Sequence, residues 1–345
     1  MPGGYMKKIN WATMIKPYQQ PNRLKSYWQI INSFTLFIGF WFLAYEAFQY
    51  SVWLTIAVAL LAQPAFLRLF IILHDCGHGS YFKKKKERDF WGTICGVITF
   101  TPYHQWAFEH ADHHKTSGNL EKRGRGDVWT LTLQEYNDSS WGKQLFYRLY
   151  RFPAFMLTVG TIYNFIVMHR FTTSLDGKKE RRSVYMTNLG ILLMGALISS
   201  VTSLEFFLIY QLSLVMFGGA LGIALFYVQH QFEGVYWSRT QDWDYETAAV
   251  YGSSYLKLPR FLQWASGNIG FHHIHHLSPM IPNYELERCY REQEYFHIEE
   301  LTITLKDIAR CYNLHLYDED TGRLLTFKEA KQSTAEPLMA AVKAS

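Results

Sequence analysis

Histidine is the residue type whose spacing in this chain points most directly to chemistry. Residues 270–279 read Gly-Phe-His-His-Ile-His-His-Leu-Ser-Pro, so His272, His275 and His276 stand at i, i+3 and i+4. On a helix these three imidazoles would share one face, with His273 on another side. The same spacing recurs at residues 110–114, and a looser pair stands four residues apart at 74–78. These two segments supply five further histidines: His74, His78, His110, His113 and His114.

Eight histidines at this spacing favour a metal centre. Protonated imidazoles in one cluster would repel one another, and buried neutral imidazoles would leave acceptor nitrogens without partners. Metal coordination removes both problems. Structural zinc takes four ligands and catalytic zinc takes three plus water, so eight nitrogens exceed the shell of one ion and predict two. Imidazole suits iron as well as zinc and copper.

The chain around these clusters is apolar in blocks, with 49% hydrophobic and 17% aromatic residues overall. Each block is close to the ~20 residues that a helix needs to cross a hydrocarbon layer of ~30 Å. The four blocks cover residues 28–48, 52–73, 185–201 and 205–227. Very short connections join the two members of each pair, and so we expect two antiparallel transmembrane hairpins.

The sequence therefore predicts an all-α integral membrane protein with two transmembrane helical hairpins (four spans) and a cytosolic helical cap that holds a di-metal site. The expected segments are a cytosolic N-terminal segment (1–27), the first hairpin (28–73), a cytosolic or in-plane segment with the first two histidine clusters (74–184), the second hairpin (185–228), and a cytosolic cap with the third cluster and the C-terminal tail (229–345).

Basic residues predict the orientation of these spans. Residues 1–27 carry five Lys or Arg and no acid, the middle segment is also basic, and both hairpin tips lack Lys and Arg. The positive-inside rule places both termini, the middle segment and all three clusters in the cytoplasm. A further apolar stretch covers residues 152–168. If it crossed the membrane alone, the third histidine cluster would lie on the opposite side from the second. We interpret that stretch, and residues 90–100, as in-plane or partly buried.

Charged residues near the clusters have a functional and a structural interpretation. Asp75 and Asp112 are candidates to accept the second N–H of a ligating imidazole and fix its tautomer, although a plain helix charge explains each as well. Arg68, six residues before His74, is either a side chain that snorkels toward the membrane surface or part of the site, and the sequence favours snorkelling. The four cysteines form no Cys-x-x-Cys pair, so neither a disulfide framework nor an iron–sulfur site is expected.

The order His-Asp-Cys-Gly-His, His-x-x-His-His and His-x-x-His-His, placed around two hairpins, resembles the membrane-bound fatty acid desaturases. The similarity extends over nearly the whole chain. Four stretches resemble the acyl-lipid desaturases of bacilli in particular: residues 119–124, 126–129, 226–233 and 267–270.

This resemblance implies a non-haem di-iron enzyme that uses O2 and two electrons to introduce a cis double bond into the acyl chain of a membrane lipid. The family's ligands carry over onto the eight clustered histidines, and a ninth family histidine matches His230. Animal members hold a metal-bound water with an asparagine four residues before that histidine, where this chain has Phe226. The candidates to complete the second iron's shell are therefore Gln229, Gln231 and Asn268.

The chemistry of the substrate agrees with this interpretation. An unactivated methylene offers no acid, carbonyl or leaving group, so its oxidation requires a metal or cofactor and a dry apolar slot. Asp127 and Trp129 are candidates to contact a head group or to bend the acyl chain, although a structural turn explains them equally well.

An electron donor is expected to be a separate protein, because the sequence shows no haem domain, dinucleotide fingerprint or cluster-binding cysteines. The resemblance implies ferredoxin or flavodoxin, both of which are acidic. Four lysines at residues 83–86 could steer such a donor, or they could bind anionic lipid head groups. We expect a multi-pass protein of the cytoplasmic membrane, with its active site facing the cytoplasm and no nucleic-acid partner.

Two alternatives remain from the sequence alone. A di-iron hydroxylase, ketolase or epoxidase would use the same scaffold and the same first hydrogen abstraction. A histidine-rich metal transporter or sensor is a different class, but a transporter would be expected to place its ligands within the spans, whereas these histidines lie beyond the span ends.

Overall fold

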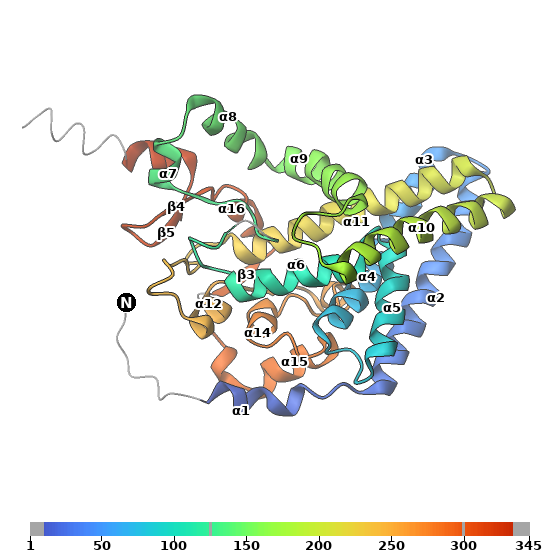
Figure 1. Cartoon of the computed structure of the whole chain (residues 1–345), viewed down its shortest axis with the longest axis horizontal. Coiled ribbons are helices and arrows are strands. Elements are labelled where there is room, and N and C mark those ends of the chain that lie inside the picture. Colours follow the sequence, from blue (N-terminus) through green and yellow to red (C-terminus); the bar gives the residue numbers. More distant parts are fainter. Residues whose placement is uncertain (1–9, 124–125, 299–300, 334–345) are drawn as a thin grey trace, which may run out of the picture.

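The computed structural model describes residues 10–123, 126–298 and 301–333. The helical hairpins extend to one side of the molecule, and most of the short helices and the strands gather on the other (Figure 1). The longer helices of the chain are α2 (Arg23–Phe48), α3 (Val52–Leu61), α4 (Gln63–His78), α5 (Lys85–Ile98), α6 (Tyr103–Thr116), α10 (Lys178–Val201) and α11 (Leu204–His230). The first nine residues of the predicted N-terminal segment and the last twelve of the tail lie outside the described residues.

Two helical hairpins form where the apolar blocks predict them. Residues 49–51 join α2 to α3, and residues 202–203 join α10 to α11. A serine caps the second helix of each hairpin: Ser51 Oγ accepts a hydrogen bond from Trp53 N, and Ser203 Oγ accepts one from Phe206 N. Such caps satisfy N–H groups that a helix start leaves without partners, so a turn of two or three residues suffices.

The second apolar block is not the single straight helix that the sequence predicts. Within it, α3 and α4 meet at Ala62 with a bend of 50°. Pro64 in the first turn of α4 explains the break, because proline lacks an N–H and its ring clashes with the preceding turn. Among the described residues, α2, α10 and α11 are each long and apolar enough to cross a membrane, and there are up to five candidate spans if each bent helix pair counts as one.

Residues 152–168 fold into short, irregular helical segments. These are α9 (Pro153–Phe155), the π-helical segments Met156–Gly160 and Ile162–Val167, and a 3-10 turn at Met168–Arg170. The segment meets α8 (Trp141–Tyr150) at an angle of 67°, and this pair has the composition of a broken span or re-entrant loop. Its in-plane location stays a prediction.

The cap contains β-structure that the all-α expectation omits. A three-stranded sheet has the order β1 (Leu131–Thr132), β4 (Leu316–Asp318) and β5 (Arg323–Leu325), and β2 (Tyr255–Lys257) pairs in parallel with β3 (Thr302–Thr304). The remaining elements are short helices: α1 (Trp11–Ile15), a 3-10 turn at Lys16–Tyr18, α7 (Leu133–Asn137), α12 (Tyr245–Tyr251), α13 (Arg260–Ala265), α14 (His272–Leu277), α15 (Asn283–Glu292), a 3-10 turn at Glu294–Phe296 and α16 (Ile308–Cys311).

Two hydrophobic cores meet where the histidines lie. Leu73 and Cys76 of α4 belong to the core between the long helices, whereas Ile274 and Leu277 of α14 belong to the core of the cap. Helices α4 and α14, which both carry clustered histidines, are thus anchored in different cores. The four cysteines are buried and free.

Candidate metal centre

The last turn of α4 carries the first histidine pair. The rings of His74 and His78 are 4.6 Å apart, and Gly79 ends the helix with a φ of +83°, which glycine adopts readily. His74 Nδ1 lies 2.9 Å from Oδ1 of Asp75, and the other oxygen of Asp75 accepts two hydrogen bonds from Asn283. Asp75 therefore fixes the His74 ring and leaves Nε2 for another partner.

Helix α6 presents the second cluster. The rings of His110 and His114 lie against those of the first pair, with centroid distances of 4.9 Å to His74 and 4.7 Å to His78. His113 turns toward Asp127, and His113 Nδ1 bonds to Oδ1 of that carboxylate. Asp127 therefore supports a histidine ring in this structure, and its contact with substrate stays a prediction.

Helix α14 and the end of α11 supply the remaining histidines. His272, His275 and His276 are all at most 3% exposed. His273 points elsewhere, as helical spacing predicts, and its Nε2 donates to the carbonyl of Phe296 at 3.3 Å. His230 is the last residue of α11, and its Nδ1 donates to the carbonyl of Gly252 at 3.0 Å, which leaves Nε2 free to face the other rings.

The structure brings the nine histidines into two adjoining groups. Ring nitrogens within 4.8 Å of one another define a group of His74, His78, His110 and His275 and a second group of His113, His230 and His276. His114 joins the first group, because its Nε2 approaches Nε2 of His110 at 3.2 Å and of His275 at 3.1 Å. His272 joins the second, because its Nε2 lies 2.9 Å from that of His230.

The state of these nitrogens fits metal binding. Burial, with the neighbouring imidazoles as a smaller cause, holds the pKa of the α6 and α14 rings well below 6.5; this applies to His110, His114, His272, His275 and His276. Neutral imidazoles are the form that ligates metals. Among the described residues, the buried Nε2 atoms of His78, His113 and His276 have no hydrogen-bond partner. Buried polar atoms are normally paired, so three unpaired imidazole nitrogens in one region indicate a site that suits cations.

A cavity of about 230 Å³ begins at the histidines and runs between α4, α11 and the segment after α9. His74, His110 and His272 lie in its wall. Most of the remaining lining is apolar, including Leu67, Phe70, Ile71, Phe165, Ile223 and Phe226. A smaller cavity of about 20 Å³ adjoins it and shares Leu67, Phe70, Phe165 and Gly222 with it. We call the two cavities together the apolar slot.

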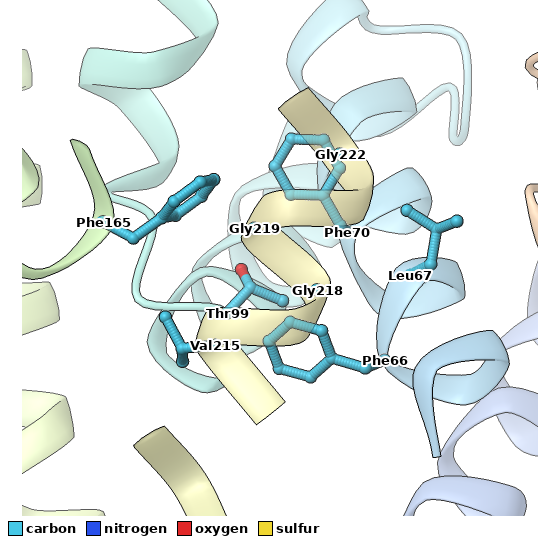
Figure 2. A pocket seen from close by; sticks show the side chains of 9 residues that line it. All are labelled: Phe66, Leu67, Phe70, Thr99, Phe165, Val215, Gly218, Gly219 and Gly222. Atoms are coloured by element: carbon cyan, nitrogen blue, oxygen red, sulfur yellow. The ribbon is translucent and has the colours of Figure 1, made fainter. Parts of the chain in front are cut away.

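Glycines of α11 shape the far end of the apolar slot. Figure 2 shows Gly218, Gly219 and Gly222 on this helix, with the aromatic rings of Phe66, Phe70 and Phe165 around them. A Cβ at Gly218 would come within 2.3 Å of Phe66, and a Cβ at Gly219 within 2.7 Å of Phe165, so both close contacts require glycine. At Gly222 a Cβ would meet no atom within 4 Å, so this glycine leaves space open.

Comparison with known proteins assigns the chain to a family. The model of the family described as "Fatty acid desaturase" matches residues 50–298. A protein of Bacillus subtilis (strain 168) named fatty acid desaturase is 43% identical over 325 residues, which cover 94% of this chain and 92% of that protein. The chain belongs to the fatty acid desaturase family.

Other relatives of this desaturase are more distant. An sn-1 oleoyl-lipid 12-desaturase of Anabaena variabilis is 26% identical over 289 residues, which cover 81% of this chain and 79% of that protein. An sn-1 acyl-lipid omega-3 desaturase (ferredoxin) of Nostoc sp. (strain 36) is 26% identical over 333 residues, which cover 91% and 88% of the two chains.

Two predicted site residues of this desaturase, one a supporting carboxylate and one a substrate candidate, lie away from the rings. Asp112 is half-buried, and among the described residues no imidazole hydrogen-bonds to its carboxylate. Trp129 packs on Tyr147 and Tyr150, with ring centroids at 5.0 and 5.6 Å, and does not line the apolar slot. Asp112 lies away from the rings because its position on the helix faces away from the side that carries residues 110, 113 and 114.

The three candidates to complete the ligand shell of the second iron differ in their positions. Gln231 is held by Arg151, which donates to its Oε1 at 2.8 Å, and Asn268 donates to the carbonyl of Asn283 at 3.1 Å; neither lines the apolar slot. Gln229 does line it, and its Nε2 donates to the carbonyl of Ile269 at 2.7 Å. Gln229 is therefore the candidate that the geometry favours.

Sequence reasoning missed Asn283 and the carbonyl of Gly252. Asn283 follows a proline at the start of α15 and lies 208 positions from Asp75 in the sequence. Gly252 is separated from His230 by 22 positions and contributes only a backbone oxygen. Neither carries a local signal, because both act through long-range contacts.

Proposed function

We propose that this desaturase uses O2 and two electrons to introduce a cis double bond into the acyl chain of a membrane lipid, at a non-haem centre of two iron ions. The observation that carries the proposal is that two imidazole groups, most of whose rings are buried, adjoin an apolar slot whose wall includes three of the histidines. A hydrocarbon chain fits an apolar slot, and its unactivated methylenes can be oxidised only with metal or cofactor chemistry.

Five histidines would hold one ion and four would hold the other. The first set is His74, His78, His110, His114 and His275, and the second is His113, His230, His272 and His276. All nine donors are imidazole nitrogens, which suit iron. When bound, the ions would supply the O2-dependent removal of two hydrogens from the acyl chain.

The protein's own groups orient the ligands and keep the slot dry. Asp75, Asp127 and the carbonyl of Gly252 each engage the Nδ1 of one histidine, so the Nε2 of that ring is presented to the metal. Phe226 places its ring 5.0 Å from His113 and 4.9 Å from His230, measured between centroids. An aromatic wall at this point excludes water from the side where the acyl chain would lie.

We propose a phospholipid-bound acyl chain as the substrate and a separate ferredoxin or flavodoxin as the electron donor. The names of the Anabaena and Nostoc relatives support a lipid-bound substrate, and the name of the second supports ferredoxin. The four lysines at 83–86 are exposed and provide a basic surface for an acidic donor. The proposed location is the cytoplasmic membrane, with the histidines on the cytoplasmic side.

Metal analysis of the purified, iron-loaded protein tests the di-iron proposal. We expect two irons per chain in the wild type and about one in His276→Ala, because that change removes a ligand of one ion only. The matched control is His273→Gln on the same helix, which should retain two irons. A wild type that holds one metal per chain, or equal loss in the control, would contradict the proposal.

Substrate presentation tests the lipid proposal separately. The same saturated acyl chain, isotopically labelled, is offered to the reduced enzyme either in the sn-1 position of a phospholipid or as a thioester. We expect label in an unsaturated product from the phospholipid, at an initial rate at least about tenfold that from the thioester. Faster conversion of the thioester would overturn the lipid-bound assignment.

A further inference from the structure

A second cavity, of about 480 Å³, also borders α4. Residues of α2, α4, β2, α13 and α15 line it, and none of the nine histidines does. Arg68, Ile71 and the turn at residues 267–269 separate the two cavities: Arg68, Gly267 and Asn268 line this one, whereas Ile71 and Ile269 line the apolar slot. We call it the basic cavity, because three cationic side chains line it.

Arg68 is the central cation of the basic cavity. The sequence predicted a snorkelling side chain, but Arg68 is only 4% exposed. Its guanidinium donates to Ser33 Oγ at 3.1 Å, to the carbonyl of Trp264 at 2.6 Å and to Asn32 Oδ1 at 3.0 Å. All three acceptors are neutral, and no carboxylate pairs with Arg68 among the described residues. A guanidinium has five N–H groups, so two remain for a ligand.

A buried charge without a counter-charge is costly, and a bound anion would offset that cost. The other charged groups around the cavity leave the balance positive. Lys25 pairs with Glu285 at 2.6 Å, and Glu287 lies 3.8 Å from Arg291, so these four charges compensate one another. Arg260 lines the cavity, is exposed and forms no ion pair with a described residue. Arg68 and Arg260 therefore supply two uncompensated positive charges.

Exposed aromatic residues beside the basic cavity indicate that the cavity lies at the level of the lipid head groups. Trp28 is 68% exposed on the candidate span α2, and Trp264 is 39% exposed on α13, next to Phe261, which is 62% exposed. Exposed tryptophans beside apolar residues are typical of the level of lipid head groups. Trp264 also stacks under Arg68, whose guanidinium carbon lies 4.2 Å from the ring centroid.

We propose that the basic cavity binds the phosphate group of an anionic phospholipid. Arg68 and Arg260 would donate to the phosphate oxygens, and the aromatic residues would contact the glycerol and the first methylenes. Asn283 connects this cavity to the metal centre. It lines the cavity and donates to the carboxylate of Asp75, which in turn bonds to His74. The inference rests on a membrane location, not on the reaction proposed above.

Native mass spectrometry of the full-length protein in detergent tests the proposal. The probes are phosphatidylglycerol, diacylglycerol with the same chains, and inorganic phosphate. We expect phosphatidylglycerol to bind at least about tenfold more tightly than diacylglycerol, and Arg260→Gln to weaken that binding about tenfold. Arg182→Gln on α10 is the matched control, since Arg182 is exposed and lies away from the cavity, and it should bind as the wild type does.

The outcomes separate the possible sources of the phosphate. Displacement of phosphatidylglycerol by millimolar inorganic phosphate would support a phosphate site but assign it to a free anion. Equal binding of diacylglycerol and phosphatidylglycerol, or unchanged binding in both Arg260→Gln and Arg68→Gln, would overturn the proposal. Arg260 is the primary target because Arg68 also joins three elements of the fold. Iron content, measured in parallel, reports the di-iron centre independently of lipid binding.

Discussion

Hydrogen bonds to Nδ1 fix three of the nine clustered histidines, and Asp127 makes the bond to His113. Asp127→Ala removes this support from the four-histidine set. Loss of such a partner weakens metal binding ~10–100-fold, so we expect one of the two metals to be lost at a free-iron concentration that saturates the wild type.

Asp112→Ala is the matched control for Asp127→Ala, since it removes a carboxylate from the same helix as His113 without touching a ring. Both variants are titrated with iron against a chelator of known affinity. If both variants lose metal equally, the carboxylate acts through general charge rather than through its contact with the imidazole.

His315 provides a pH-dependent test away from the metal centre. Burial, followed by the charges of Arg151 and Arg148, lowers the pKa of His315 to about 3. Its unfolded pKa is near 6.5, so the unfolded state binds more protons between pH 6.5 and 3, and His315 makes stability fall as the pH decreases through that window. His315 contributes at most ~1.4 kcal/mol per pH unit to the change in the free energy of unfolding with pH.

Thermal unfolding in detergent between pH 7 and pH 5 measures this effect. His315→Phe keeps an aromatic ring against Phe327, whose centroid is 4.3 Å away, but cannot titrate. We expect the midpoint of the variant to decrease less over this range than that of the wild type. Parallel curves would show that His315 is protonated as easily in the fold as in the unfolded chain.

The histidines themselves were predictable because their spacing is local. An i, i+3, i+4 pattern specifies one face of a helix wherever the helix lies, and α6 and α14 follow it. Asp75 was identified for the same reason, since it adjoins His74. The contact between Asp127 and His113 was not predicted, because nothing in the local sequence shows that the two residues lie close together.

At the scale of elements, α11 shapes the apolar slot through its glycines, and Gly222 is the one with open space beside it. Gly222→Leu should keep the helix, since leucine favours helices more than glycine does, and should place four carbons in the slot. We expect the ratio of unsaturated 18-carbon to 16-carbon products to fall about tenfold, because a few methylenes of pocket length give discrimination of that size.

Gly39→Leu on α2 is the control for Gly222→Leu, because a Cβ at Gly39 also meets no atom within 4 Å, yet Gly39 lines neither part of the slot. Fatty acid profiles of cells that express each variant give the ratio. An unchanged ratio in Gly222→Leu, with normal protein levels, would mean that the acyl chain does not reach this end of the slot.

The elements differ in how well the sequence predicts them. Long apolar blocks with very short connections predicted the hairpins, because the length of an apolar block is a local property of the sequence. The break at Ala62 also has a local cause, which is Pro64. The prediction missed it because it was made from the length of the apolar block alone. Strands such as β1 and β4 are two or three residues long and pair with distant partners, so no periodic pattern marks them.

At the scale of the whole molecule, the four lysines at 83–86 could serve an acidic electron donor. Their replacement by glutamine should lower turnover with ferredoxin about tenfold at low salt and have little effect at high salt, because steering between exposed charges is screened. Turnover with purified donor is measured across ionic strength. Equal turnover of both proteins at every salt concentration would favour a role of these lysines at the lipid surface.

In our proposal, two irons held by the two histidine groups desaturate an acyl chain. The most direct measurement is gas chromatography with mass spectrometry of total fatty acids, from a host without unsaturated lipids that expresses the wild type or His113→Ala. We expect a new monounsaturated fatty acid with the wild type and none with the variant. A hydroxylated product, or no product from folded, iron-loaded protein with ferredoxin supplied, would contradict it.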